Sequence, residues 1–373
     1  MIKLDTITLK EILSKMSKCL GNDKNVPITQ LMHIYTEGNS VIFLTTDEIN
    51  AMKYTYTFDT AEAIDSINIA VLAEPFIKLI SKFSSAETKI GVSDSGNEVL
   101  IAGNGEYKLS LPLDSSGKPI NFPLLPMIKV AESTACEDAN VYYGDVSMII
   151  QAAKSSESAI TKQSVDLAVE DYPRTNYYFG QIGCVTLDGF KATWVNTNEF
   201  NFEALIYPST VKLLPLMSND NFSARKIEDI MLFQCDGIKL YSKCAQGLDA
   251  FPHEVATSLL NQQVDNSVTI TAAGFYSALD RLKLFITALD ENCVKLSFKE
   301  DGMFAATMSG NCVEQIAADN LPTFECVVDI DNLMSQLKCL GDAAPKLFFG
   351  DTEIIIMRSD AISQLVVLCN DEE

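Results

Sequence analysis

Apolar and polar residues alternate along the chain in an order that occurs three times. Each third begins with an amphipathic helix, continues with strands, and adds a second helix and a closing hairpin. In the first third, Leu9, Ile12, Leu13, Met16 and Leu20 recur at helical spacing, which predicts a helix over 8–20. The same reasoning predicts five further helices, at 72–84, 146–158, 208–218, 274–287 and 329–340.

Strands follow the first helix of each third, over 41–58, 183–207 and 294–317. The closing hairpins have turn residues at Asp94-Ser-Gly-Asn, Asp236-Gly and Gly350-Asp-Thr. Linkers are expected at the proline-rich 112–126 and at 251–267, and Pro215 is expected to shorten or kink the fourth helix because proline lacks an amide hydrogen. The pattern predicts an α+β fold of three similar domains, at 1–122, 123–256 and 257–373.

The composition agrees with several packed cores. The chain has 373 residues, of which 47% are hydrophobic, and this length usually divides into more than one domain. Charged residues interrupt the first segment, so it does not resemble a signal peptide, and no apolar run reaches the roughly 18 residues that span a bilayer. We expect a soluble, cytoplasmic protein.

The cysteines indicate neither disulfides nor a zinc site. Ten are present and no two have CxxC spacing. Most lie inside apolar runs, as Cys184, Cys235 and Cys326 do, which is typical of reduced, buried thiols.

The net charge of −22 is unevenly distributed. The six expected helices carry ten Lys or Arg and six Asp or Glu, a net +4, so the rest of the chain carries −26. The lysines could be ordinary solvated residues. Alternatively, the positive helices could make loose contacts with the backbone of a polyanion, while the acidic remainder of the chain repels that polyanion from other surfaces.

No catalytic constellation is present. The two histidines, His33 and His253, lie in different thirds, and the chain has no GxxxxGK[ST] or GxSxG motif. Gly103-Asn-Gly105 is expected to be a turn, and the acidic pairs Asp47-Glu48 and Glu170-Asp171 to be chance neighbours. We expect no active site, metal or cofactor; an acidic, metal-dependent hydrolase is the least favoured alternative.

Several segments together resemble the bacterial β sliding clamp, the processivity subunit of the replicative DNA polymerase. Their order and spacing carry the resemblance over nearly the whole chain: VPI (26–28), LTTDE (44–48), VLAEPFIKLISKF (71–83), NYYFG (176–180), GLDAFP (247–252) and VKLSF (294–298). The resemblance implies a head-to-tail homodimeric ring, with the helices of three domains per chain inside and antiparallel sheets outside. Such a ring encircles double-stranded DNA without reading its sequence.

The resemblance also implies two of the sites. A basic residue of the clamp loop falls at Lys24, and the candidate DNA contacts on helices are Lys10, Lys15, Lys78, Lys82, Lys154, Lys212, Arg281 and Lys338. For the dimer interface, Tyr107 and Leu109 match apolar clamp positions and should meet Phe285 and Ile286, near the end of a helix in the partner copy. Leu109 and Ile286 could instead be ordinary core residues.

The third implied site is a cleft that receives short peptides from polymerases and the clamp loader. Its matching positions are Phe179, Asn196, Phe200, Asn201, Pro252, Thr257, Val366 and Leu368. The chain departs from the family here. The family's Thr-Asp-Gly-His-Arg-Leu segment reads Asn-Thr-Asn-Glu-Phe-Asn over 196–201, and its Met-Pro-Met-Arg-Leu tail reads Leu-Cys-Asn-Asp-Glu-Glu over 368–373. These differences favour a divergent clamp with a dedicated partner; a clamp-like scaffold that binds proteins instead of DNA is the alternative.

Overall fold

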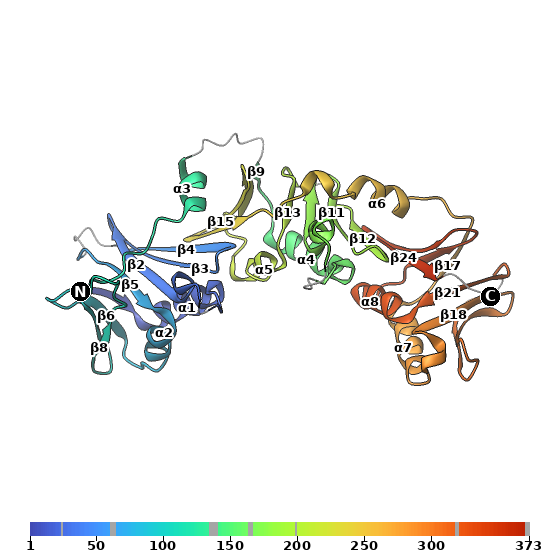
Figure 1. The fold of residues 1–373 in the computed structure, drawn as a ribbon, viewed down its shortest axis with the longest axis horizontal. Helices are drawn as coiled ribbons and strands as arrows, with labels where there is room; N and C mark the ends of the chain where they lie inside the picture. Colours follow the sequence, from blue (N-terminus) through green and yellow to red (C-terminus); the bar gives the residue numbers. More distant parts are fainter. Residues whose placement is uncertain are drawn as a thin grey trace. The chain divides into compact units, whose positions relative to one another are not determined.

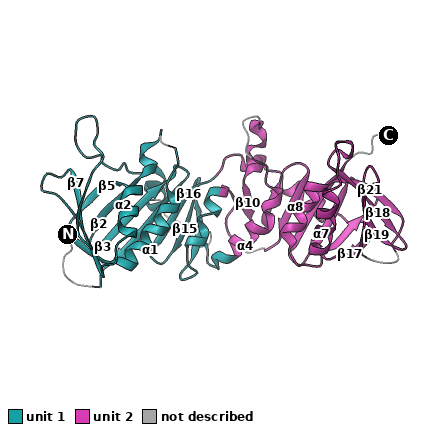
Figure 2. Ribbon diagram, turned by 90° about the horizontal axis from the view of Figure 1, so that it is seen from below, with its two compact units in different colours: residues 1–147, 209–244 teal, residues 148–208, 245–373 magenta. Residues whose placement is uncertain are grey.

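The computed structural model describes residues 1–23, 25–59, 65–133, 141–162, 167–197, 200–317 and 321–369. They form two compact units: unit 1 contains Met1–Ser147 and Ser209–Cys244, and unit 2 contains Met148–Pro208 and Ala245–Glu373 (Figure 2). The chain therefore leaves unit 1, returns to it and leaves it again. Both units combine helices with antiparallel sheets, which confirms the expected α+β class (Figure 1).

Unit 1 contains two sheets. The smaller has the order β1-β6-β7-β8, with β1 Ile2–Asp5, β6 Glu87–Val92, β7 Glu98–Ala102 and β8 Glu106–Ser110. The larger has the order β5-β2-β3-β4-β16-β15-β14-β9. Its strands are β5 Asn68–Leu72, β2 Leu31–Glu37, β3 Ser40–Thr46, β4 Asn50–Thr57, β16 Ile238–Lys243, β15 Ile230–Cys235, β14 Ser223–Ile227 and β9 Val141–Tyr142.

The helices of unit 1 are α1 Thr6–Met16, α2 Ala73–Ser81 and α3 Pro126–Ser133. The α1 helix begins where the Asp5 carboxylate accepts the Thr8 amide at 2.8 Å, a cap that stabilises a helix by about 1 kcal/mol. Its predicted apolar stripe is buried at Leu9, Ile12, Leu13 and Met16. Figure 2 shows α1 and α2 side by side over one face of the unit 1 strands.

Unit 2 is built on one sheet, with the order β13-β10-β11-β12-β24-β21-β18-β19-β20 and a branch from β24 through β23 and β22 to β17. The first group of strands is β10 Tyr177–Gly180, β11 Gly183–Leu187, β12 Lys191–Val195 and β13 Ala204–Ile206. The second group is β17 Asn266–Thr269, β18 Cys293–Lys299, β19 Gly302–Thr307, β20 Val313–Ala317, β21 Phe324–Asp329, β22 Lys346–Phe349, β23 Ile354–Ser359 and β24 Ile362–Cys369.

The helices α6 His253–Leu260, α7 Ala272–Lys283 and α8 Ile330–Leu340 belong to unit 2. The helices α4 Val146–Ser156 and α5 Pro208–Val211 begin at the points where the chain changes unit. A large cluster of buried apolar residues, including Phe275, Leu279, Leu333 and Leu337, fixes α7 and α8 on the sheet. Fully burying such a side chain contributes about 1.5–3 kcal/mol.

All six predicted helices are confirmed, with shifted ends. The helix predicted over 208–218 ends at Val211, and a 3-10 turn over Leu214–Leu216 contains Pro215, as expected. The helix predicted to reach 287 ends at Lys283. Two helices were not predicted: α3 and α6 lie in or beside the expected linkers, because their apolar faces pack on the sheets, Met127 and Ile128 on one and Ala256 and Leu260 on the other.

The two large sheets contain a junction of the same kind. In unit 1, β4 pairs antiparallel with β16, and in unit 2, β12 pairs antiparallel with β24. Each junction ends in a backbone hydrogen bond to the preceding hairpin: Lys243 N donates to Ile49 O at 2.9 Å, and Val367 N donates to Phe190 O at 2.8 Å. Strands from successive thirds of the chain thus join in one sheet, twice, in the same way.

Candidate functional surfaces

Three of the candidate basic residues on the helices are engaged within the chain. Lys10 Nζ donates to Phe83 O at 2.6 Å, which ties α1 to the end of α2. Lys78 forms an ion pair with Glu74, one turn away on α2. The Arg281 guanidinium makes two hydrogen bonds, of 2.9 and 2.7 Å, to the Glu314 carboxylate, which raises the pKa of the guanidinium further. The carboxylates of Glu74 and Glu314 partly neutralise the charges of Lys78 and Arg281, whereas Lys10 keeps its charge but is held by a carbonyl.

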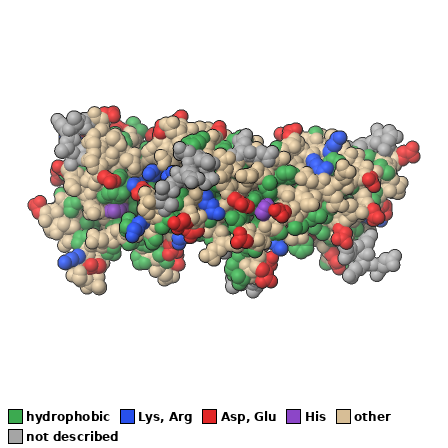
Figure 3. Space-filling view, turned by 90° about the horizontal axis from the view of Figure 1, so that it is seen from above, with side chains coloured by type: hydrophobic (Ala, Val, Ile, Leu, Met, Phe, Trp, Pro, Cys, Tyr) green, Lys and Arg blue, Asp and Glu red, His purple; other side chains and the backbone are tan. Residues whose placement is uncertain are grey.

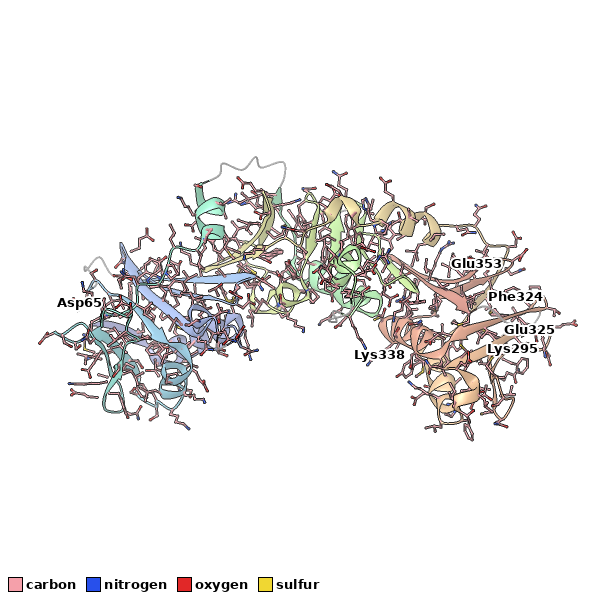
Figure 4. All side chains as sticks on the ribbon, viewed as in Figure 1. Asp65, Lys295, Phe324, Glu325, Lys338 and Glu353 are labelled. Atoms are coloured by element: carbon pink, nitrogen blue, oxygen red, sulfur yellow. The ribbon has the colours of Figure 1, made fainter. Side chains whose placement is uncertain are left out.

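Four others are exposed and form no ion pair or side-chain hydrogen bond with any described residue: Lys82, Lys154, Lys212 and Lys338. Lys338 lies on α8 of unit 2 (Figure 4). Lys15 is half-buried at the end of α1, and Lys24 lies outside the described residues. The side opposite to that of Figure 2 shows Asp and Glu side chains dispersed over both units (Figure 3).

The strand β8 is a free edge of the smaller sheet, because it pairs with β7 and with no other described strand. Tyr107 on this strand is partly exposed, and its ring lies 5.3 Å from that of Phe83. Leu109 is half-buried and lies opposite Val99. An exposed edge leaves backbone donors and acceptors unpaired and can accept another strand.

The other two candidate interface residues lie beyond the helix that was expected to contain them. Phe285 is exposed, whereas Ile286 is half-buried against the core of unit 2. Two neighbours that sequence reasoning missed, Leu284 and Leu289, are more exposed than either. The early end of the helix explains this exposure, because an apolar residue beyond Lys283 no longer lies on the apolar stripe of the helix.

The eight residues matched to a peptide cleft do not come together in one exposed site. Phe179 and Phe200 are buried and pack edge to face at 5.2 Å, and Val366 is also buried. Asn196 is exposed, and Asn201 borders a pocket of about 240 Å³ that Tyr178 and Glu203 also line.

Register explains the separation. Val195 lies opposite Ile362, whereas Lys191 lies opposite Val366, so Asn196 and Val366 stand at opposite ends of the ladder between β12 and β24. Five residue steps along the strand, at about 3.4 Å each, separate them by about 17 Å. Pro252, Thr257 and Leu368 are half-buried, and the first two lie at the beginning and within α6, which packs on β11, β12 and β24.

The hairpin between β11 and β12 is the segment that lies beside Val366 and Val367. It turns at Asp188-Gly189 and continues with Phe190, which is 64% exposed. Its Asp-Gly pair is the sequence signal that could have identified it, since the family's segment also contains Asp-Gly. On α6, Val255 and Leu259 are exposed one turn apart. These apolar side chains form the candidate partner surface.

The part of the chain that the structure describes contains no group of three or more His, Cys, Asp or Glu that could hold a metal ion. Nine cysteines lie in this part, all as free thiols. None of the helices described is both long enough and apolar enough to span a bilayer.

Comparison with known proteins gives one consistent result. No model of a known protein family matches the sequence. A curated protein of Staphylococcus epidermidis named beta sliding clamp is 21% identical over 95% of this chain and 95% of its own length. Solved structures of bacterial sliding clamps share the fold, and two of them serve as examples. One is the DNA polymerase sliding clamp of Bacillus subtilis, with a TM-score of 0.78, 18% identity and coverage of 99% of this chain and 98% of that one.

The second is the Helicobacter pylori beta clamp bound to a DNA ligase peptide, with a TM-score of 0.76, 14% identity and coverage of 99% of both chains. The resemblance to bacterial sliding clamps is thereby confirmed, and the chain has their fold. The low identity marks this chain as a divergent relative.

Proposed function

We propose, from its likeness to the bacterial beta sliding clamps, that this chain is a DNA sliding clamp. Two copies would close head to tail into a ring around duplex DNA and keep a polymerase on its template, with no active site and no cofactor. The observation that carries the proposal is the repeated junction of β4 with β16 and of β12 with β24, in a chain that matches clamps over 95% of its length.

The same junction supports the three-domain organisation. Each junction joins strands of two successive thirds, so 1–122, 123–256 and 257–373 would be three similar domains connected through shared sheets. The two compact units divide the middle third between them, because its β16, which continues the sheet to β15 and β14, pairs with β4, whereas its β12 pairs with β24. We expect this protein in the cytoplasm, because a clamp like those of bacteria would act there during DNA replication.

Contact with DNA would come from the exposed lysines. Lys82, Lys154, Lys212 and Lys338 are available to phosphate oxygens, whereas Lys10, Lys78 and Arg281 already have partners. Contacts to phosphate carry no sequence information, and a few exposed lysines hold a duplex loosely enough for sliding. Lys24 and Lys15 remain candidates of the same kind.

Polymerases and a clamp loader would bind through short peptides. The Helicobacter pylori relative is described as bound to a DNA ligase peptide, and the equivalent surface here would include Phe190, Val255 and Leu259 beside Pro252, Thr257 and Leu368. A few apolar anchors normally supply most of the affinity of such a surface. The alternative function, a scaffold that binds proteins and not DNA, is favoured by the internal partners of Lys10, Lys78 and Arg281.

The decisive experiment compares charge reversals on helices and on strands. The first variant combines Lys82→Glu, Lys154→Glu and Lys338→Glu. The matched control combines Lys243→Glu, Lys299→Glu and Lys346→Glu, which are likewise exposed lysines, on β16, β18 and β22. Affinity for a random-sequence duplex is measured against salt concentration.

We expect the helix variant to reduce the slope of log affinity against log salt by about 3, since each lost phosphate contact removes about 0.9. The strand variant should keep the wild-type slope. Equal slopes for all three proteins would reject the clamp and leave the scaffold.

A further inference from the structure

The segment that follows α7 exposes apolar side chains at unusual density. Leu284 is 81% exposed, Phe285 is 51% exposed and Leu289 is 85% exposed. None of the three is buried, whereas the intervening Ile286 packs against the core of unit 2. A concentration of exposed apolar residues in one short segment is typical of a protein interaction surface.

One buried carboxylate holds this segment in place. Asp290 is 1% exposed, and its carboxylate accepts hydrogen bonds from Thr287 N and Thr287 Oγ1, each at 2.7 Å. It also accepts Ser309 N at 2.7 Å. The Thr287 and Ser309 backbone amides hold the pKa of the Asp290 carboxyl well below its usual range, so the group is charged. Burial of a charge is costly, and these three bonds offset the cost.

Ser309 connects the carboxylate to an edge strand. It lies in the turn between β19 and β20, which closes where Thr307 N donates to Cys312 O at 3.1 Å. The next residue, Val313, begins β20 and is exposed. Among the described strands, β20 pairs with β19 alone. Asp290 thus joins the apolar segment Leu284–Leu289 to a strand whose other side is unpaired.

We propose that Asp290 is a positioning residue that pre-organises a self-assembly surface, made of Leu284, Phe285, Leu289 and the free edge of β20. Its occupant is a second copy of this chain, which presents the edge strand β8. This inference rests on the proposed head-to-tail dimer and adds the residue that shapes one side of it.

Two observations identify the second copy as the occupant. First, β8 is also a free edge, so pairing with β20 would satisfy backbone donors and acceptors of both strands. Second, β8 carries Tyr107, an aromatic side chain partly exposed beside Phe83, which can cover the apolar segment. Each chain offers one surface of each kind, so two copies make two identical contacts and close.

The hydrogen bonds of Asp290 matter for assembly, because a flexible segment loses conformational entropy when it binds. A loop that must be ordered on binding loses conformational entropy, which weakens the complex without changing any contact. With Asp290 charged and in place, that entropy is already lost in the monomer. Removal of the carboxylate should therefore weaken the dimer more than it weakens the fold.

The test measures dimer dissociation by analytical ultracentrifugation for the wild type, Asp290→Asn and Leu289→Ser. Leu289 is exposed, so Leu289→Ser leaves the fold intact even if Asp290→Asn proves unstable. The matched control is Asp331→Asn, which removes an exposed carboxylate paired with Lys283 on the helix side. Hydrogen exchange over 284–289 reports directly on the positioning role.

We expect Asp290→Asn and Leu289→Ser each to raise the dissociation constant at least tenfold, and Asp331→Asn to change it less than twofold. Amides over 284–289 should exchange faster in Asp290→Asn alone. If the wild type is a dimer and both Asp290→Asn and Leu289→Ser have the wild-type dissociation constant, this inference is overturned and the proposed dimer stands. A monomeric wild type at micromolar concentration would instead contradict the proposed ring.

Discussion

Glu48 occupies, in the turn between β3 and β4, the left-handed backbone position that Gly189 occupies in the turn between β11 and β12. The φ angles are +80° at Glu48 and +97° at Gly189. The preceding aspartate caps both turns: Asp47 Oδ1 accepts Ile49 N at 3.0 Å and Asn50 N at 2.6 Å, and Asp188 Oδ1 accepts the two corresponding amides at 3.0 Å. The turns are therefore equivalent, and only one has the residue that its backbone prefers.

Replacement of Glu48 with glycine should stabilise the protein. A side chain in the left-handed region costs about 1 kcal/mol, and Glu48 is exposed, so little packing is lost. We expect Glu48→Gly to raise the free energy of unfolding by about 0.5–1 kcal/mol. Chemical denaturation measures the change.

One control replaces a glutamate with glycine in a helix, and the other replaces the glycine of the equivalent turn. Glu11→Gly, in the exposed interior of α1, should destabilise by about 1 kcal/mol, because glycine lowers helix propensity. Gly189→Ala should also destabilise, although its new Cβ would meet only Arg174 Nη1, at an ordinary 3.7 Å. Stabilisation by Gly189→Ala would show that the turn does not impose the left-handed conformation.

Arg358 on β23 fastens the end of α6. Its Nε and Nη2 donate to Leu260 O at 3.0 and 2.8 Å, Nη2 also donates to Gln262 O at 2.7 Å, and the guanidinium lies over the Phe348 ring at 4.5 Å. A hydrogen bond to a charged donor contributes about 1.5–3 kcal/mol, and these bonds also satisfy carbonyl groups at the end of α6. We expect Arg358→Met to accelerate hydrogen exchange at the α6 amides.

The exchange of α8 amides in the same protein serves as the internal reference and should not change. Arg174→Met is the matched control, since Arg174 forms a half-exposed ion pair with Asp171 that contributes little. If α6 exchanges at the wild-type rate in Arg358→Met, then packing of Ala256 and Leu260 on the sheet suffices to hold the helix. In that case the candidate partner surface on α6 does not depend on Arg358.

His33 should make the stability of the protein fall below neutral pH. Its ring stacks between Tyr35 and Phe122, with centroids at 4.5 and 5.0 Å, and its Nε2 lies 2.7 Å from Asn68 Oδ1. Burial lowers the pKa of His33 below its ordinary 6.5, and the bond to Asn68 only partly opposes this. The unfolded chain therefore binds the proton first as the pH falls below 6.5, and stability is lost until the folded-state pKa is reached.

His33→Phe keeps an aromatic ring in the stack and removes the titration. We expect the unfolding free energy of the wild type to decrease relative to His33→Phe between pH 7 and pH 5, as denaturant titrations at each pH would show. Parallel curves over this range would mean that His33 has the same pKa in the folded and unfolded chain.

Local sequence determined the regular elements with strong signals of their own. The stripe of Leu9, Ile12, Leu13 and Met16, with Asp5 as cap, marks α1 in the local sequence, and Pro215 lies where its helix has ended, as its missing amide hydrogen favours. The threefold order of elements follows from periodicity that each segment carries alone, whereas the resemblance to sliding clamps rests on the order and spacing of short segments such as LTTDE (44–48) and GLDAFP (247–252).

Only the tertiary structure decided which of these residues lie together. α3 forms beside one expected linker and α6 forms inside the other, because sheets cover their short apolar faces. A local pattern does not show which distant strands will bury such a face. The register between β12 and β24 placed the Asp188-Gly189 hairpin, and not Asn196, beside Val366, since the partners of a strand are set by distant residues. The sequence thus specified the repeated elements, whereas long-range packing and pairing decided the surfaces on which the proposed clamp would bind DNA, a second copy and its partners.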